Sequence, residues 1–518
     1  MGMEHGLKRA EDLIAQRHYA QACDQLRALV DEQPRLATAR FLYSRALFHL
    51  GAFADAEQQA MACFKLGSDK PDLLFGLARQ LGNFLRLAEA RTCLSHPRFR
   101  RDAPPAVLAE AAVLLNGLGD SAMALECVTL ALARDPKHAP ALYFRGNLRL
   151  FAGDLDAADH DYEACLRVSP GYAQAAWMQS SLRTQTVEKN HVARLQKQLR
   201  NAQVGMGGEI YLSFAMFKEL HDLQRYDEAW TALTYGCRAK RARLNYSMAA
   251  SASLFDALQN SRLQPNASTL PQASVTPIFI VGMHRSGTTL LEQILAGHSA
   301  VTDGGESYGF SVSMRRIANQ SAGGVVDRVL AEKLNDQDAA LLAQDYWQNN
   351  TERAQGRPYL TEKLPSNFLN LGYIADALPN ARFLHLVRDP METCFSNLRV
   401  LFSDAAPYSY DQAEMADYFI RYHRLMRHWH ARYPGRILDV DFRALTTDTE
   451  TVAREVMAFC GLPFEATASD IGERRSSVAT ASAAQIRQRI EAPKASAWLP
   501  YADHLKALQA RLAEAGLV

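Results

Sequence analysis

Small apolar residues and polar turns alternate along the first half of the chain with a constant period. Alanine recurs at intervals of 34 residues, at Ala22, Ala56, Ala90, Ala124 and Ala158. A small side chain at a fixed place after each turn lets two helices approach closely, so the pattern predicts a repeating helix pair. Because such a pair cannot bury its apolar stripe alone, we expect about five pairs to stack into a curved α-solenoid.

The pattern changes in the middle of the chain. A polar stretch with a proline and no apolar period follows Leu258 and predicts a linker. The next apolar run, Pro277–Val281, is β-branched and aromatic, as is typical of a buried parallel strand. We therefore predict a helical-repeat domain over residues 1–245, a linker over 246–274 and an α/β domain with a parallel sheet over 275–518.

Composition and charge exclude several classes of protein. The 518-residue chain is 48% hydrophobic and 22% charged, which indicates ordinary globular domains rather than a disordered or coiled-coil protein. A net charge of +1 provides no general basic field, so nucleic-acid binding is not expected. The first thirty residues carry charges throughout, and no later apolar run approaches the length of a membrane span. We therefore expect a cytoplasmic protein.

The sequence contains no pattern that is typical of a metal site. Its eight cysteines lie far apart without a Cys-x-x-Cys pair, so neither a zinc site nor a disulfide framework is predicted. His428 and His430 flank a tryptophan and are expected on a packed helix. No metal cofactor is predicted.

A glycine-bounded turn joins the predicted strand to a predicted helix. The turn is Gly282-Met283-His284-Arg285-Ser286-Gly287-Thr288-Thr289, and Leu290–Leu295 continues as a helix. Backbone N–H groups and the positive end of the helix then surround one point, as in phosphate-binding loops. Thr288 replaces the lysine of nucleotide triphosphatases, which disfavours an ATPase or a kinase. A coincidental glycine turn is the alternative.

A second candidate anion contact follows another predicted strand, Arg382–Val387. Arg388 ends this strand, and Ser396 lies about two helical turns further along nearly the same helix face. Open α/β sheets bind ligands at the carboxyl ends of their strands. Arg388 and Ser396 are therefore candidate phosphate contacts, with a salt bridge from Arg388 to a neighbouring acid as the alternative.

These motifs resemble those of sulfotransferases. The string Arg285–Thr289 is similar to their 5′-phosphosulfate loop, and Arg388 with Ser396 is similar to their 3′-phosphate site. The resemblance is closest to sulfotransferases with tetratricopeptide repeats, which the 34-residue period also resembles, and protein-tyrosine sulfotransferases are more distant. It implies transfer of a sulfuryl group from 3′-phosphoadenosine 5′-phosphosulfate (PAPS) to an unknown acceptor hydroxyl. The implied donor contacts are Arg285, Ser286, Gly287, Thr288, Thr289, Arg388 and Ser396.

The resemblance also implies the catalytic residues. Glu306 matches the glutamate that acts as general base, and Asp303 is the competing carboxylate. Lys363 matches the lysine that neutralises charge in the transition state, with a solvated surface lysine as the alternative. Arg285 is expected to provide positive charge for the sulfuryl oxygens.

The last part of the chain resembles the family in one loop, and two positions differ from the family pattern. The late loop resembles one that closes over the donor, and its implied donor contacts are Ser482, Arg487 and Lys494. Phe442 stands where a tyrosine is frequent, and Ala497 stands where a basic residue is common. These departures leave a second hypothesis open, namely a repeat scaffold with an inactive sulfotransferase domain.

The repeat array itself has two interpretations. Its concave face is a docking surface for a peptide, a partner chain or the acceptor, or the array only covers an apolar face of the second domain or mediates dimerisation. The sequence does not separate these interpretations.

Overall fold

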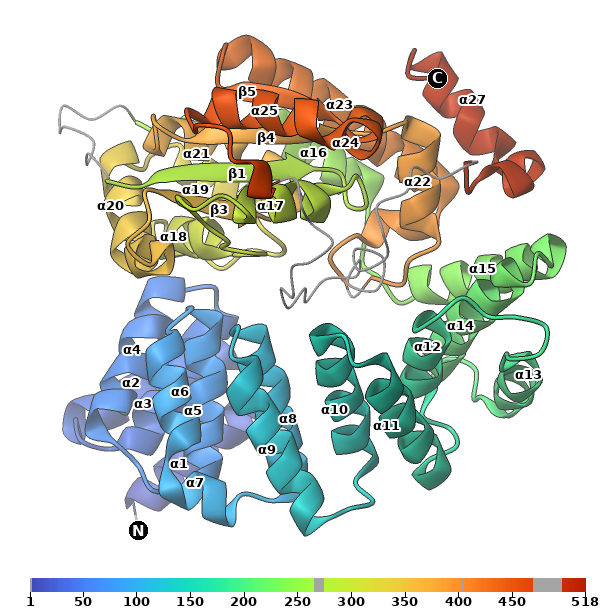
Figure 1. Ribbon diagram of the computed structural model, residues 1–518. Helices are drawn as coiled ribbons and strands as arrows, with labels where there is room; N and C mark the ends of the chain where they lie inside the picture. Colours follow the sequence, from blue (N-terminus) through green and yellow to red (C-terminus); the bar gives the residue numbers. More distant parts are fainter. Residues whose placement is uncertain (1, 265–273, 403, 469–495) are drawn as a thin grey trace. The chain divides into compact units, whose positions relative to one another are not determined.

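The computed structural model describes residues 2–264, 274–402, 404–468 and 496–518 (Figure 1). The chain divides into two compact units. The first contains residues 1–148 and 311–323, and the second contains residues 149–310 and 324–518. The division between residues 148 and 149 falls inside the repeats. The predicted boundary between the repeat domain and the linker at residue 245 stays a prediction.

Consecutive helices build the first unit, and their pairing confirms the helical repeats predicted from the sequence. They are α1 Gly2–Ala15, α2 Tyr19–Glu32, α3 Ala37–His49, α4 Phe53–Leu66, α5 Pro71–Asn83, α6 Leu87–Ser95, α7 Pro97–Asp102, α8 Pro105–Gly117, α9 Ser121–Arg134 and the first part of α10 Ala139–Ala152. The periodic alanines Ala22, Ala56, Ala90 and Ala124 are completely buried. They lie at helix contacts because a larger side chain would separate the helices.

A left-handed residue lies at the same register in the turn between the two helices of each repeat. Gly51, Gly119 and Gly153 have φ values of +86°, +79° and +88°, as their conformational freedom allows. Arg17 and Leu85 hold the same place in the 34-residue period and also have positive φ values, of +62° and +55°. The turn geometry is therefore maintained even where the sequence has no glycine.

The first unit also contains residues 311–323, which the sequence analysis assigns to the α/β domain. Nε of Arg316 lies 2.6 Å from a carboxylate oxygen of Glu57, and both side chains are largely buried. The side-chain oxygen of Asn319 accepts a hydrogen bond of 2.8 Å from the backbone N–H of Ala54, in the first turn of α4. These contacts link the segment to the second repeat.

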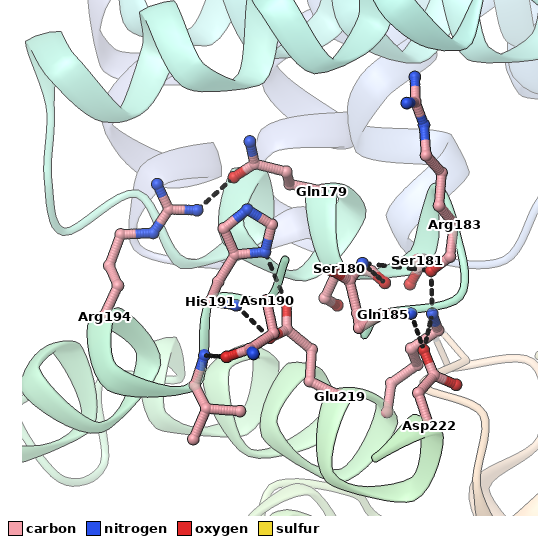
Figure 2. A network of polar contacts seen from close by, with 12 residues as sticks. Gln179, Ser180, Ser181, Arg183, Gln185, Asn190, His191, Arg194, Glu219 and Asp222 are labelled. Carbon is pink, nitrogen blue, oxygen red and sulfur yellow. Dashed lines mark hydrogen bonds and ion pairs between the residues drawn. The ribbon is translucent and has the colours of Figure 1, made fainter. Parts of the chain in front are cut away.

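The remaining repeat helices belong to the second unit. They are α11 Leu155–Val168, α12 Ala173–Ser181, α13 Val192–Asn201, α14 Gly208–Asp222 and α15 Tyr226–Arg241. Polar contacts hold the irregular connection between α12 and α13 (Figure 2). The buried Glu219 accepts hydrogen bonds from the backbone N–H and Nδ1 of His191, at 2.5 and 2.7 Å. Asp222 accepts one of 2.8 Å from the backbone N–H of Gln185.

Helices α14 and α15 are bonded to later parts of the same unit. Arg241 pairs with Glu414 at 2.6 Å, and Nδ1 of His221 lies 2.8 Å from the hydroxyl of Tyr501. Part of the predicted linker is also helical, since α16 covers Met248–Gln259 and its Phe255 packs edge-on against Tyr418. The linker was predicted from the polar residues that follow Leu258. The segment before them is helical because it buries apolar side chains such as Phe255 and Leu258.

A parallel sheet forms the centre of the second unit, as predicted, and it has five strands. Its order is β2-β3-β1-β4-β5. The strands are β1 Thr276–Gly282, β2 Val301–Thr302, β3 Tyr359–Lys363, β4 Arg382–Val387 and β5 Ile437–Asp441. Since all neighbouring strands run parallel, their carboxyl ends share one edge of the sheet.

Helices cover the sheet on both faces (Figure 1). Ile280, Leu384 and Val440 form a buried core with α17, Thr288–Ala296, and α25, Thr449–Cys460. The alternate strand positions face the other side, where α23 lies. The further elements are α18 Gly309–Ile317, α19 Arg328–Leu334, α20 Ala339–Asn350, α21 Leu371–Ala377, α22 Pro390–Leu398, α23 Gln412–Arg432, α24 Phe442–Thr447 and α27 Lys506–Glu514, with 3₁₀ turns at Thr351–Ala354, Pro365–Phe368, Pro407–Tyr410, Ala466–Ala468 and Leu499–Leu505.

Candidate active site

The loop between β1 and α17 needs glycine at both of its ends. A Cβ atom on Gly282 would lie 2.9 Å from Oγ of Ser286 and 3.0 Å from the carbonyl oxygen of Leu386. Gly287 has a φ of +111°, and a Cβ atom there would overlap the ring of Phe442. The two glycines therefore let the backbone close into a tight loop, as the sequence analysis expects.

Several donor groups gather at this loop around the start of α17. Gly287 is the N-cap residue of α17 and provides no side-chain acceptor for the first N–H groups of the helix. Ser286, Thr288 and Thr289 are buried, and Oγ of Ser286 has no hydrogen-bond partner within the described part of the chain. The first N–H groups of a helix have no partner within the helix, and together with its positive end they suit an anionic oxygen.

The two predicted phosphate motifs meet in the structure. Nε of Arg285 lies 3.4 Å from Oγ of Ser396, and Nη1 of Arg388 donates to the carbonyl oxygen of Arg285 at 3.1 Å. Arg388 also pairs with Glu392 at 3.2 Å, so the salt bridge considered as an alternative is present as well. Arg285, Arg388 and Ser396 therefore surround a single site.

Positive charge accumulates around these motifs. Burial, together with repulsion from Arg399 and Arg388, lowers the pKa of Arg285 to about 10. Burial likewise lowers the pKa of Arg388, although Glu392 and Asp389 oppose the effect. Buried cations that repel one another are stabilised by an anion between them.

Sequence reasoning missed Arg399 and the position of Phe442. The pKa of Arg399 is lowered by burial and by Arg388, which places it in the same positive cluster. Its spacing of eleven residues from Arg388, about three helical turns, is a signal that could have identified it. Phe442 lies against Gly287 and has its ring centroid 4.7 Å from Cζ of Arg388.

The predicted base and lysine form an ion pair at the end of β3. Nζ of Lys363 lies 2.5 Å from a carboxylate oxygen of Glu306 and 3.9 Å from one of Glu292. Lys363 is completely buried, whereas the side chain of Glu306 is 44% exposed. Burial, and then the charge of Asp303, raise the pKa of Glu292 well above its ordinary value. Glu306 is thus the carboxylate that is both near Lys363 and accessible from solvent.

His284 lies in the same loop and was not predicted as a site residue. Its Nδ1 lies 3.0 Å from the hydroxyl of Tyr408. Burial lowers the pKa of His284 to about 4, with Glu306 opposing and Lys363 and Arg285 adding to the shift. The imidazole is therefore neutral near pH 7 and adds no further charge to the loop.

A pocket of about 400 Å³ opens at the carboxyl ends of β4 and β5. Ser286 and Arg388 line it, together with residues of α23. Glu306 and Lys363 are not among its lining residues. Ser482, Arg487 and Lys494 lie outside the described residues.

A glycine-bounded loop between a parallel strand and a helix, with arginines converging on it, defines an α/β protein of the phosphate-loop class. Residues 277–466 match the family model of the Sulfotransferase family, and residues 139–172 match that of the Tetratricopeptide repeat. The chain therefore contains a sulfotransferase-family segment and a tetratricopeptide repeat, which confirms the resemblance described above.

Individual relatives match parts of the chain. An uncharacterized protein of Aquifex aeolicus (strain VF5) is 26% identical over 390 residues, 72% of this chain and 50% of that protein. Protein-tyrosine sulfotransferase 1 of Mus musculus is 33% identical over 122 residues, 22% of this chain and 31% of that protein. The chain thus spans half of the first relative and less than a third of the second. The solved sulfotransferase domain from the Synechococcus PCC 7002 olefin synthase is 19% identical, with coverage of 48% of this chain and 98% of that chain and a TM-score of 0.30.

The substitution Gly287→Ala should destabilise the protein. A left-handed alanine costs about 1–3 kcal/mol, and the added methyl group would also displace the Phe442 ring. Chemical denaturation measures the loss. Gly171→Ala is the matched control, because a Cβ atom there meets nothing within 4 Å. Equal stabilities of the two variants would contradict the described loop.

Proposed function

We propose that this protein is a sulfotransferase that transfers a sulfuryl group from PAPS to an acceptor hydroxyl. The observation that carries the proposal is the meeting of the two phosphate motifs. Arg285 contacts Ser396, and Arg388 contacts the backbone of Arg285. Each contact joins two residues that lie more than a hundred positions apart in the chain. A donor with both a 5′-phosphosulfate and a 3′-phosphate needs two adjoining anion sites of this kind.

Each part of the donor has a suitable set of residues. The N–H groups of residues 286–289 and the guanidinium of Arg285 would hold the 5′-phosphosulfate end. Arg388 and Ser396 would hold the 3′-phosphate, with Arg399 adding positive charge. The unpaired Oγ of Ser286 and the glycine at 287 fit a loop that closes around an oxyanion.

Glu306 and Lys363 are suited to the transfer step. The acceptor oxygen forms a bond to sulfur, the bond between sulfur and the 5′-phosphate oxygen breaks, and adenosine 3′,5′-bisphosphate leaves. Glu306 takes the proton of the acceptor hydroxyl, and Lys363 provides positive charge where negative charge develops. The ion pair between them holds the carboxylate of Glu306 in place before the acceptor binds.

A scaffold with an inactive transferase domain is the second candidate. Its support is Phe442, which packs on the loop at Gly287 and offers no hydroxyl to a nucleotide. The repeats are proposed to dock a peptide or protein partner in either case, because residues 139–172 match the tetratricopeptide repeat. Among the described residues, no helix combines the length and the apolar character needed to cross a membrane. Cytoplasmic localisation stays a prediction.

A thermal-shift measurement separates the two candidates. Adenosine 3′,5′-bisphosphate at ~100 times its dissociation constant should stabilise the protein by about 2.7 kcal/mol. ATP with Mg²⁺ is the control, and it should stabilise the protein less because Thr288 stands in place of the phosphate-loop lysine. Absence of any shift with the bisphosphate would favour the scaffold.

The acceptor class can then be found by donor-dependent sulfation. Phenols, sugars and peptides are incubated with PAPS and the full chain, and the products are identified by mass spectrometry. Sulfation of one class supports the proposed activity. If the bisphosphate binds and no class is modified, the protein binds the donor without the proposed transfer to these acceptors.

A further inference from the structure

Two histidines and an aspartate come together on the sheet face that is covered by α23. His385 of β4 and Asp439 of β5 are partners in the parallel register. Leu384 and Leu386 belong to the core on the opposite face, so His385 between them points toward α23. The neighbouring Leu438 and Val440 likewise contact that core, which directs Asp439 to the same side as His385.

Helix α23 brings the third residue to the same place. Phe419, Tyr422, Met426 and His430 follow one another at intervals of three or four residues and line the pocket along one helix face. Nε2 of His430 lies 2.8 Å from Oδ1 of Asp439, and Nδ1 of His385 lies 2.6 Å from the same oxygen. One ligand atom from each of the three residues lies within 4.8 Å of the others.

A further side chain orients the most buried of the three residues. Nε2 of His385 is hydrogen-bonded to the hydroxyl of Tyr422, which leaves Nδ1 directed toward Asp439. Histidines that bind metals usually have their second ring nitrogen held in this way. The side chain of His385 is 8% exposed, whereas His430 and Asp439 are 36% and 53% exposed, so the cluster is open on its outer side.

We propose that His385, His430 and Asp439 form a binding site for a divalent transition metal ion, for which zinc is best suited. Imidazole nitrogen and carboxylate oxygen are common zinc ligands, and three protein ligands leave a fourth position open. Two ligand atoms of a tetrahedral zinc ion lie roughly 3.3 Å apart. The histidine nitrogens now lie 2.6 and 2.8 Å from Oδ1 of Asp439, so each distance would have to increase by about half an ångström or slightly more. The half-exposed His430 and Asp439 can make this adjustment, and the open position takes water or an anionic oxygen from the pocket.

The site differs from the predicted sulfuryl-transfer residues. Glu306 and Lys363 do not line this pocket, and the bond changes of sulfuryl transfer require no metal ion. The absence of a metal cofactor, expected from the sequence, was inferred from spacing alone. Sequence spacing cannot reveal this cluster, because positions 385, 430 and 439 meet only through the register of β4 with β5 and the placement of α23.

Equilibrium zinc binding to the full chain tests the proposal. With the purification tag removed, competition against a chromophoric chelator should give one Zn²⁺ per chain. His430→Gln and Asp439→Asn should each weaken binding by on the order of 100-fold or more, and Tyr422→Phe by roughly 10- to 100-fold. His428→Gln is the matched control on the same helix and should leave zinc affinity unchanged, since His428 lies outside the cluster.

Cobalt reports the ligands in the unaltered protein. All eight cysteines are buried, and a thiolate charge-transfer band of bound Co²⁺ would show that the metal binds to one of them instead. For the wild-type chain, we expect a visible cobalt spectrum without the thiolate band. This cobalt spectrum should disappear in Asp439→Asn. No zinc binding by the wild-type chain, equal affinity in His430→Gln, or a thiolate band would each overturn the proposal, and none of these results depends on sulfuryl transfer.

Discussion

Glu306→Gln should lower the turnover number for sulfuryl transfer by roughly 10²- to 10⁴-fold, the usual contribution of a positioned general base. Glutamine keeps the size of the side chain but cannot take the proton from the acceptor hydroxyl. Lys363 would lose the negative charge of its partner at 2.5 Å, while the carboxylate of Glu292 stays at 3.9 Å. Initial rates at saturating PAPS and acceptor measure the effect, and bisphosphate affinity should be retained because Glu306 pairs with Lys363 and is not one of the proposed phosphate contacts.

Asp303→Asn is the comparison that identifies the base. Asp303 is exposed and lies three residues before Glu306, so it is the carboxylate that competes for the role. Its substitution should leave the turnover number within the same order of magnitude. Unchanged turnover in Glu306→Gln, or a larger loss in Asp303→Asn, would remove Glu306 from the mechanism while leaving donor binding intact.

Arg285→Ala should weaken binding of adenosine 3′,5′-bisphosphate by roughly 10- to 100-fold. A charge-assisted hydrogen bond contributes about 1.5–3 kcal/mol, and each 1.4 kcal/mol corresponds to about tenfold in affinity. Arg285 also contacts Ser396, so its loss loosens both phosphate motifs at once. Arg388→Ala should weaken binding to a similar extent, because Arg388 is the predicted contact of the 3′-phosphate.

Titration calorimetry with a surface control measures these losses. Arg328→Ala removes an arginine whose ion pair with Glu332 is exposed on both sides, and nucleotide affinity should not change. Full affinity in either Arg285→Ala or Arg388→Ala would contradict the donor assignment for that residue. An equal loss in Arg328→Ala would indicate a general charge effect instead of a specific site.

The fold was predictable where local pattern determines it. The 34-residue period identified the repeats because a buried alanine is required at each helix contact, and the strand, loop and helix at residues 276–296 were readable from their local composition. The left-handed turns at Arg17 and Leu85 were not readable, since these residues rarely adopt positive φ. The packing of residues 311–323 with the first unit depends on long-range contacts that no local pattern reports.

The site was predictable only in part for the same reason. Resemblance located Glu306 and Lys363, and the structure places them in contact. Arg399 was missed because its repulsion of Arg285 depends on burial of both side chains, which no known motif reports. His284 stands next to Arg285 in the sequence, but its burial and its contact with Tyr408 arise only on folding. The histidine and aspartate cluster was missed because three separate elements contribute to it.

A crystal structure with adenosine 3′,5′-bisphosphate tests the central claim most directly. We expect the 5′-phosphate against the backbone N–H groups of residues 286–289, and the 3′-phosphate between Arg388 and Ser396. A loop that stays empty at saturating nucleotide, or a nucleotide bound away from both motifs, would contradict the account.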